Sequence, residues 1–93
     1  MVQPCHGPAS LGLSREEARV LHAAVLRRIE RECEAGRVPT ELETLRERIE
    51  SCESLDSAHL AAAERALDTY VDDAPERDRP HARAVLDYVR MSR

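Results

Sequence analysis

The side chains best suited to metal binding and to nucleophilic chemistry are four histidines and three cysteines. Cys5 and His6 are adjacent and lack a second pair of ligands at a suitable spacing. In the helical hairpin predicted below, Cys33 and Cys52 lie about 12 Å apart along the hairpin axis. We therefore predict no metal site and interpret Cys33 and Cys52 as small buried side chains. A thiol or metal-dependent sensor that uses them with nearby histidines remains an alternative.

The histidines are candidates for general base catalysis. His22 lies within the apolar stripe of the first predicted helix, His59 near the start of the third and His81 at the start of the fourth. A single histidine on an apolar helix face is most often a packed residue with one hydrogen-bonded ring nitrogen. The sequence contains no HExxH, GxGxxG, GxxxxGK[ST] or GxSxG pattern. We predict that the chain is not an enzyme and binds no cofactor.

The densest basic cluster consists of Arg27, Arg28 and Arg31, which could contact phosphate groups. Three glutamates alternate with these arginines, and the whole chain has a net charge of -4. The opposite charges cancel most of the long-range attraction for a polyanion. Phe and Trp are absent, so the chain lacks two of the aromatic side chains on which the bases of single-stranded nucleic acids usually stack. We do not expect nucleic acid as a partner, although a DNA-linked regulator using arginine-bearing helices is an alternative.

These residues must be positioned by one small domain, because the chain has 93 residues with 42% hydrophobic and 34% charged side chains. Residues 1–12 contain Pro4, Gly7, Pro8 and Gly12 and show no periodicity, which predicts a flexible N-terminal tail before a helical domain over 13–93. The longest uncharged stretch, residues 1–14, lacks a sustained apolar run. We predict a cytoplasmic protein that does not enter a membrane.

Helix start and stop signals divide the domain into four helices, near 15–35, 41–51, 57–73 and 79–91. Ser14 with Glu17, and Thr40 with Glu43, match the capping-box pattern, whereas Asp56 and Asp78 are single cap candidates. The short connection between the first two helices predicts an antiparallel hairpin. The expected fold class is all-α, a four-helix domain made of two antiparallel helical hairpins. Three long helices and a short one is the alternative.

Apolar periodicity predicts which face of each helix is buried. In the first helix Val20 and Ala24 lie nearly opposite the predicted core stripe, so we expect them at the surface, with a second contact face as the alternative. The third helix is the expected centre of packing, because its apolar face contains small alanines. The predicted stripes are Ala18, Leu21, His22, Val25, Leu26, Ile29 and Cys33 in the first helix, and Leu60, Ala63, Leu67, Tyr70, Val71 and Ala74 in the third.

The fourth predicted helix offers a candidate interface. His81 and Tyr88 are seven residues apart and extend its apolar arc to one side. Tyrosine suits an interface, because its ring can be covered while its hydroxyl stays in water. We therefore predict a homodimer through this helix, with the alternative that both residues only line the rim of the monomer core. The predicted core residues of the helix are Ala82, Val85, Leu86 and Val89.

Three segments, SREEARVLHAAVLRRIE, LDSAHLAAAERALDTYVDDA and APERDRPHARAVLDYV, are similar to a family of small uncharacterised helical proteins from haloarchaea. The resemblance covers roughly residues 13–90. It agrees with fourteen basic residues that are all arginine and with the acidic charge balance. The resemblance implies a helical fold and a cell type, but no catalytic or binding residues. The leading functional hypothesis is a non-enzymatic protein–protein interaction module whose partner is another protein or a second copy of itself.

Overall fold

The computed structural model describes residues 11–92, which form four α-helices and no strand. The helices are α1 (Arg15–Glu34), α2 (Thr40–Glu50), α3 (Ser57–Asp73) and α4 (Arg79–Ser92), and a 3-10 turn, η1 (Glu76–Asp78), precedes α4. The predicted all-α class and the four predicted helices are confirmed. The predicted tail over residues 1–12 falls mostly outside the described residues, and Leu11 is partly buried against the core.

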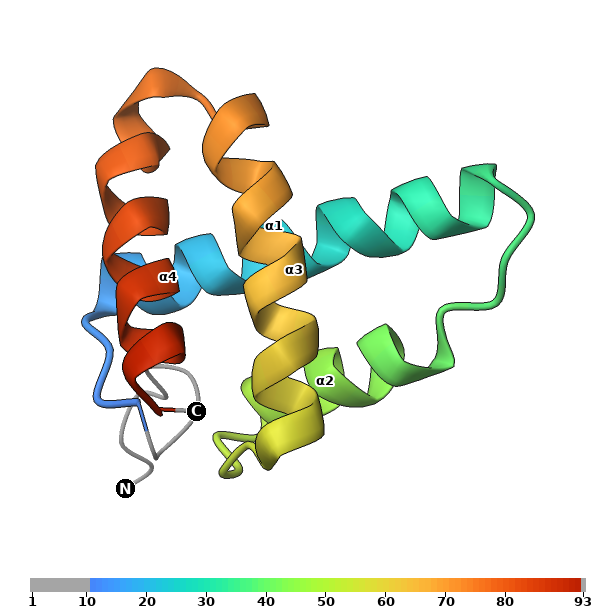
Figure 1. Ribbon diagram of the computed structural model, residues 1–93, viewed down its shortest axis with the longest axis horizontal. Helices are drawn as coiled ribbons and strands as arrows, with labels where there is room; N and C mark the ends of the chain where they lie inside the picture. The colour runs from blue at the N-terminus through green and yellow to red at the C-terminus, as the bar shows by residue number, and fades with distance from the viewer. Residues whose placement is uncertain (1–10, 93) are drawn as a thin grey trace.

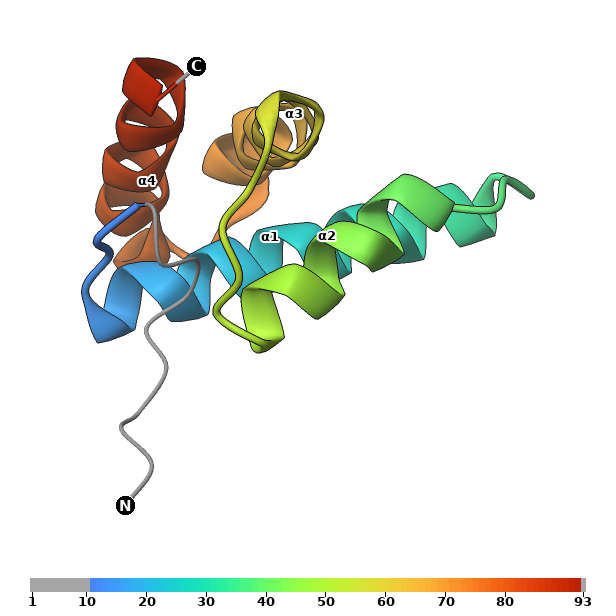
Figure 2. The same cartoon turned by 90° about the horizontal axis from the view of Figure 1, so that it is seen from below.

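The helices form two antiparallel hairpins that lie in two layers. Helices α1 and α2 run side by side in one layer, and α3 and α4 lie across them in the other (Figure 2). Helix α3 contacts all three other helices and occupies the centre of the molecule (Figure 1), as its alanines predicted. The C-terminal half of α1 extends beyond α3, so the tip of the α1–α2 hairpin projects from the body of the fold.

The prediction of surface positions for Val20 and Ala24 is wrong, because both side chains are fully buried. Helix α1 contacts α2 on one side and the α3–α4 layer on another, so it buries two faces instead of one. Two members of the predicted stripe are instead exposed, namely Leu26 at 38% and Cys33. These residues lie in the half of α1 that leads toward the projecting tip, where fewer neighbours cover the helix.

Two of the predicted helix caps are present. The Ser14 hydroxyl accepts a hydrogen bond from the Glu17 amide at 3.2 Å, and Glu17 accepts one from the Ser14 amide at 2.9 Å. Asp56 likewise accepts from the amide of His59 at 2.9 Å. The cap predicted at Thr40 is wrong, because Thr40 is already the first residue of α2 and Pro39 occupies the cap position. A residue with helical backbone cannot turn its side chain back onto the free amides of the first turn.

Helices α1 and α2 end in the same way, with a residue in the left-handed backbone region. At the end of α1 this residue is Gly36, with φ of +78°, and after α2 it is Cys52, with φ of +58°. In both cases the next residue donates to a carbonyl one turn back, at 2.9 Å. The interpretation of Cys52 as a buried side chain is wrong, since Cys52 lies half-buried in the turn beyond α2.

Candidate functional site

The predicted interface lies on α4. The buried residues of this helix determine which of its side chains face solvent. The four predicted core residues of α4, Ala82, Val85, Leu86 and Val89, are all buried. Arg90 donates to Glu64 of α3 at 3.0 Å and lies 3.7 Å from Asp68 of the same helix. These contacts fix the rotation of α4 about its own axis.

The candidate site is the outer stripe of α4, which we define as His81, Ala84, Tyr88 and Met91. Their spacings of three, four and three residues place them on one side of the helix. Tyr88 is 42% exposed and Met91 81% exposed, whereas His81 and Ala84 are half-buried. The described residues contain four exposed large hydrophobic side chains, and two of them lie on this stripe.

The outer stripe lies on the flank of α4 opposite to Arg90. Tyr88 precedes Arg90 by two residues, which corresponds to a rotation of about 200° around the helix. Arg90 contacts α3 from one flank of the buried face of α4, and Tyr88 lies on the other flank of that face. In Figure 1 α3 lies on one side of α4, and the start of α1 passes behind α4. The alternative that His81 and Tyr88 only line the rim of the core fits the half-buried His81 better than it fits Tyr88.

A buried carboxylate holds the start of α4 against the rest of the fold. Asp78 is 3% exposed and accepts hydrogen bonds from Arg19 of α1 at 2.8 Å and from the Tyr70 hydroxyl of α3 at 3.2 Å. The hydrogen bond from Arg19 keeps the pKa of the Asp78 carboxyl below its ordinary value. Burial raises the pKa of the Tyr70 hydroxyl, with the Asp78 charge acting in the same direction.

Asp78 does not play the role that the sequence predicted for it. A cap residue needs an extended backbone, but Asp78 belongs to the 3-10 turn that leads directly into α4. Its carboxylate oxygens are directed to α1 and α3 instead. Sequence reasoning missed this role because the partners are 59 and 8 residues away along the chain. Met91 was also missed, although its spacing of three from Tyr88 was a usable signal.

The candidate metal ligands lie on separate elements. His22 on α1 is hydrogen-bonded to Glu50 on α2 at 2.8 Å, and the Nδ1 atom of His59 lies 2.8 Å from Asp56. His59 is buried, as predicted for a packed histidine, but its buried Nδ1 atom forms no hydrogen bond within residues 11–92. Cys33 is an exposed free thiol, so its interpretation as a buried side chain is wrong. Within residues 11–92 no group of three or more His, Cys, Asp or Glu side chains is arranged to hold a metal ion. Cys5 and His6 lie outside the described residues.

The arginine cluster of α1 faces α3 and is partly neutralised by its own chain. Arg31 pairs with Asp73 of α3, and Arg28 pairs with Glu32 at 3.2 Å and donates to Thr69 at 3.3 Å. These contacts attach the arginines to the fold and reduce the positive charge available to a polyanion. Among the described helices, none has the length and apolar character needed to cross a membrane.

Comparison with known proteins places the chain in a family. The model of a family of unknown function, DUF7853, matches residues 11–90, so the chain belongs to this family. The match supports the resemblance to a family of small uncharacterised proteins. No curated protein and no solved structure matches the chain.

Proposed function

We propose that this member of DUF7853 is a non-enzymatic protein–protein interaction module that self-associates through the outer stripe of α4. The observation that carries the proposal is the exposure of Tyr88 and Met91 on the flank of α4 opposite to Arg90, which contacts α3. A 93-residue domain buries only about two thirds of the surface that its unfolded chain exposes, so covering this stripe with a second copy would add stability.

The outer stripe is complementary to itself. If two α4 helices pair antiparallel about a twofold axis near position 86, Ala84 lies opposite Tyr88 of the second copy, and His81 lies opposite Met91. The small side chain then leaves room for the large ring, as packing between helices requires. Each small residue on one side of position 86 faces a large residue on the other side in the second copy. The same surface is therefore used by both copies, which favours a closed dimer over an open chain of subunits.

Charged residues at the edge of the stripe support the same pairing. Arg83 and Asp87 lie beside the stripe and form no ion pair within residues 11–92. In the antiparallel pair they lie on the same edge, so Arg83 of each copy comes close to Asp87 of the other. Two such exposed pairs contribute little affinity, but they set the register of the helices.

The proposal is tested by light scattering on the full chain at concentrations up to about 1 mM, because a single helix face is a small interface and associates weakly. We expect about twice the 10.5 kDa chain mass for the wild type. Tyr88→Glu should give the monomer mass, because it places a charge at the centre of the pairing. Val38→Glu is the matched control, since Val38 is an 83% exposed apolar residue in the α1–α2 loop. A monomeric wild type at the highest concentration, in both low and molar salt, would contradict the proposal.

The two alternatives have weaker support. For a DNA-linked regulator, Arg28 and Arg31 are already paired with acidic residues of the same chain. For a thiol or metal-dependent sensor, Cys33 lies on α1 and Cys52 in the turn after α2, without a cluster of ligands around either in the described part of the chain. The exposed apolar side chains of the α4 stripe give the interaction module the stronger support.

We extend the proposal to the cellular setting, a cytoplasmic role in a haloarchaeon. It is supported by the sequence resemblance and by the exclusive use of arginine with a net negative charge. A protein adapted to this setting keeps its fold in molar KCl and loses stability as the salt is removed. The measurement is the thermal midpoint across KCl concentrations, combined with fractionation of the native cells. A midpoint that falls steadily as KCl rises would argue against a high-salt source.

A further inference from the structure

The turn after α2 contains a cysteine that the proposed function does not use. Cys52 is disulfide-bonded and half-buried, whereas Cys33 is an exposed free thiol. The sequence contains one further cysteine, Cys5, which lies outside the described residues. Within a single chain, Cys5 is therefore the cysteine that remains as a partner for Cys52.

The backbone at Cys52 points to a role for its side chain. Cys52 has a φ of +58° and is the one non-glycine residue of 11–92 with a positive φ. At the equivalent position after α1 the chain uses Gly36, which adopts this backbone without a steric penalty. A β-carbon makes the left-handed region unfavourable, so local backbone preference does not explain a cysteine here. An unfavourable backbone at a reactive side chain is typical of a functional position.

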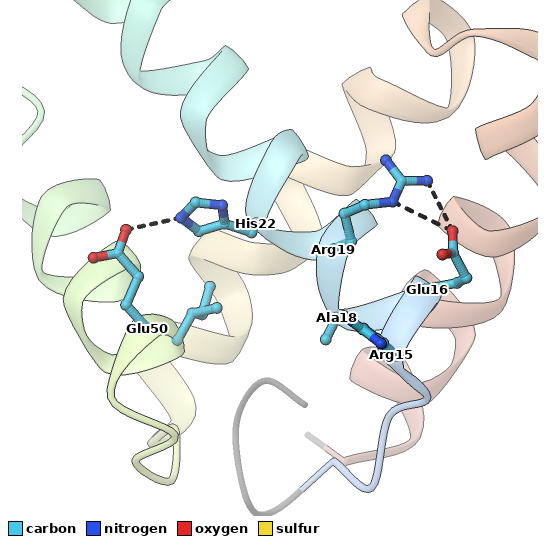
Figure 3. Close-up of a pocket in the computed structure, with 7 residues that line it drawn as sticks. Arg15, Glu16, Ala18, Arg19, His22 and Glu50 are labelled. Atoms are coloured by element: carbon cyan, nitrogen blue, oxygen red, sulfur yellow. Dashed lines mark hydrogen bonds and ion pairs between the residues drawn. The ribbon is translucent and has the colours of Figure 1, made fainter. Parts of the chain in front are cut away.

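The start of α1 and the end of α2 lie on the two sides of one open pocket (Figure 3). His22 of α1 reaches across to Glu50 of α2 at 2.8 Å, and Cys52 follows Glu50 by two residues. The chain that leads into α1 is also attached to the fold, because Leu11 is partly buried against the core. Cys5 precedes Leu11 by six residues, which can span about 20 Å when extended. The segment before α1 therefore starts close to the end of α2 and has several residues with which to reach the turn.

We infer that Cys5 and Cys52 form a reversible disulfide, which ties the N-terminal segment, residues 1–10, to the turn after α2. The bond closes a covalent loop that contains α1 and α2. Such a loop restricts the unfolded chain and so stabilises the folded state. In a cytoplasm, a disulfide of this kind responds to the redox state of the cell. The inference is independent of self-association, because it uses no residue of α4.

The bond forms by thiol–disulfide exchange with a low-molecular-weight disulfide. The thiolate of one cysteine attacks a sulfur of this oxidant, which gives a mixed disulfide and releases one small thiol. The thiolate of the second cysteine then attacks the protein sulfur of the mixed disulfide and releases the second small thiol. The two cysteines lose two protons and two electrons, and the oxidant gains them as two thiols. An excess of small thiol reverses both steps.

Peptide mapping of the full wild-type chain tests the pairing directly. The chain is equilibrated with oxidised glutathione, its free thiols are blocked with iodoacetamide in denaturant, and it is digested with trypsin without reduction. Cleavage after arginine places the three cysteines on separate peptides, 1–15, 32–37 and 49–65. We expect mass spectrometry to find 1–15 linked to 49–65, with 32–37 alkylated. The linked species should disappear after treatment with excess reduced glutathione. A link that includes 32–37, a link between two copies of 49–65, or alkylation of all three peptides would overturn the inference.

Cysteine variants test the stabilisation. The thermal midpoint of the oxidised wild type should lie about 10 °C above that of the reduced protein. Cys5→Ser and Cys52→Ser should each abolish this difference. Cys33→Ser is the matched control and should retain it, because Cys33 is a free thiol. Loss of the difference in Cys33→Ser, or a wild-type midpoint that reduction leaves unchanged, would refute the tether. If a variant fails to fold, the peptide map of the wild type still decides the pairing.

Discussion

The two halves of α1 are held in the fold by different forces. All buried residues of this helix lie between Ala18 and Val25, where α2 and the α3–α4 layer cover it. From Leu26 to Thr44, a segment that includes the rest of α1, the connecting loop and the start of α2, no residue is buried. We call the first segment the core half of α1 and the second the projecting tip.

Ile29 and Leu42 of the projecting tip are partly buried against the core, and charged side chains also connect the tip to itself and to α3. Arg31 pairs with Asp73, Arg37 with Glu32, and Glu41 with Arg65 at 3.2 Å. Exposed ion pairs of this kind contribute between zero and about 1 kcal/mol each. Burying a leucine contributes about 2 kcal/mol or more. We therefore expect the projecting tip to open at a lower cost in free energy than the core half of the same helix.

The sharpest test of this difference compares two leucines five residues apart. Leu21 is fully buried in the core half, whereas Leu26 is 38% exposed at the start of the tip. Leu21→Ala should lower the free energy of unfolding by about 3 kcal/mol, since it leaves a cavity that the surroundings fill only partly. Leu26→Ala should lower it by less than about 1 kcal/mol. Denaturant unfolding measures both, and equal losses would show that the tip is as tightly packed as the core.

Asp78 gives the next largest expected effect, because it joins the core half of α1 to α3 and α4. Asp78→Ala should lower the free energy of unfolding by about 2 kcal/mol, since it leaves the buried Tyr70 hydroxyl without its acceptor.

The carboxyl of Asp78 also predicts how the stability of the fold depends on pH. Its pKa is lowered in the folded state, so its contribution is complete above the unfolded value near 4 and is lost as the pH falls further. In acid titrations of stability, Asp78→Asn should flatten the loss below about pH 4, and an unchanged profile would assign that loss to other carboxyls.

One substitution at each end of α1 compares the stability of the projecting tip with that of the rest of the fold, because the two have a similar expected cost. Ser14→Ala removes the cap of α1 and should cost about 1 kcal/mol in global stability. Gly36→Ala forces a left-handed backbone on a residue with a β-carbon, at a similar local cost of about 1 kcal/mol. If the tip opens separately, the Gly36 change should speed amide exchange in residues 28–44 and leave the global midpoint nearly unchanged. An equal shift of the global midpoint by both variants would show that the molecule unfolds as one unit.

The smallest effect is expected for a single ion pair of the tip. Arg31→Gln should reduce stability by less than about 1 kcal/mol, and the reduction should shrink further in molar salt, because the pair with Asp73 is partly exposed. Hydrogen exchange of the last two turns of α1 measures the change locally. If Arg31→Gln lowers stability by the same amount in molar salt, the stabilisation comes from packing of the arginine side chain and not from its charge.

Local rules were sufficient for the helices and much of the core. Ser14 and Asp56 mark helix starts by hydrogen bonds within three residues, and the apolar period correctly placed Leu67 and Val85 inside. For the candidate site, periodicity placed His81 and Tyr88 on one side of α4. These features depend on residues within about one or two turns of each other, so the sequence determines them directly.

The tertiary structure alone decided how many faces of each helix are covered. Val20 is buried and Cys33 is exposed because α3 and α4 cross α1 over its N-terminal half and leave its other half projecting. The acceptor role of Asp78 arises from the same crossing of elements distant in sequence. Periodicity identifies one apolar face of a helix, but the number and angle of its neighbours determine whether a second face is removed from water.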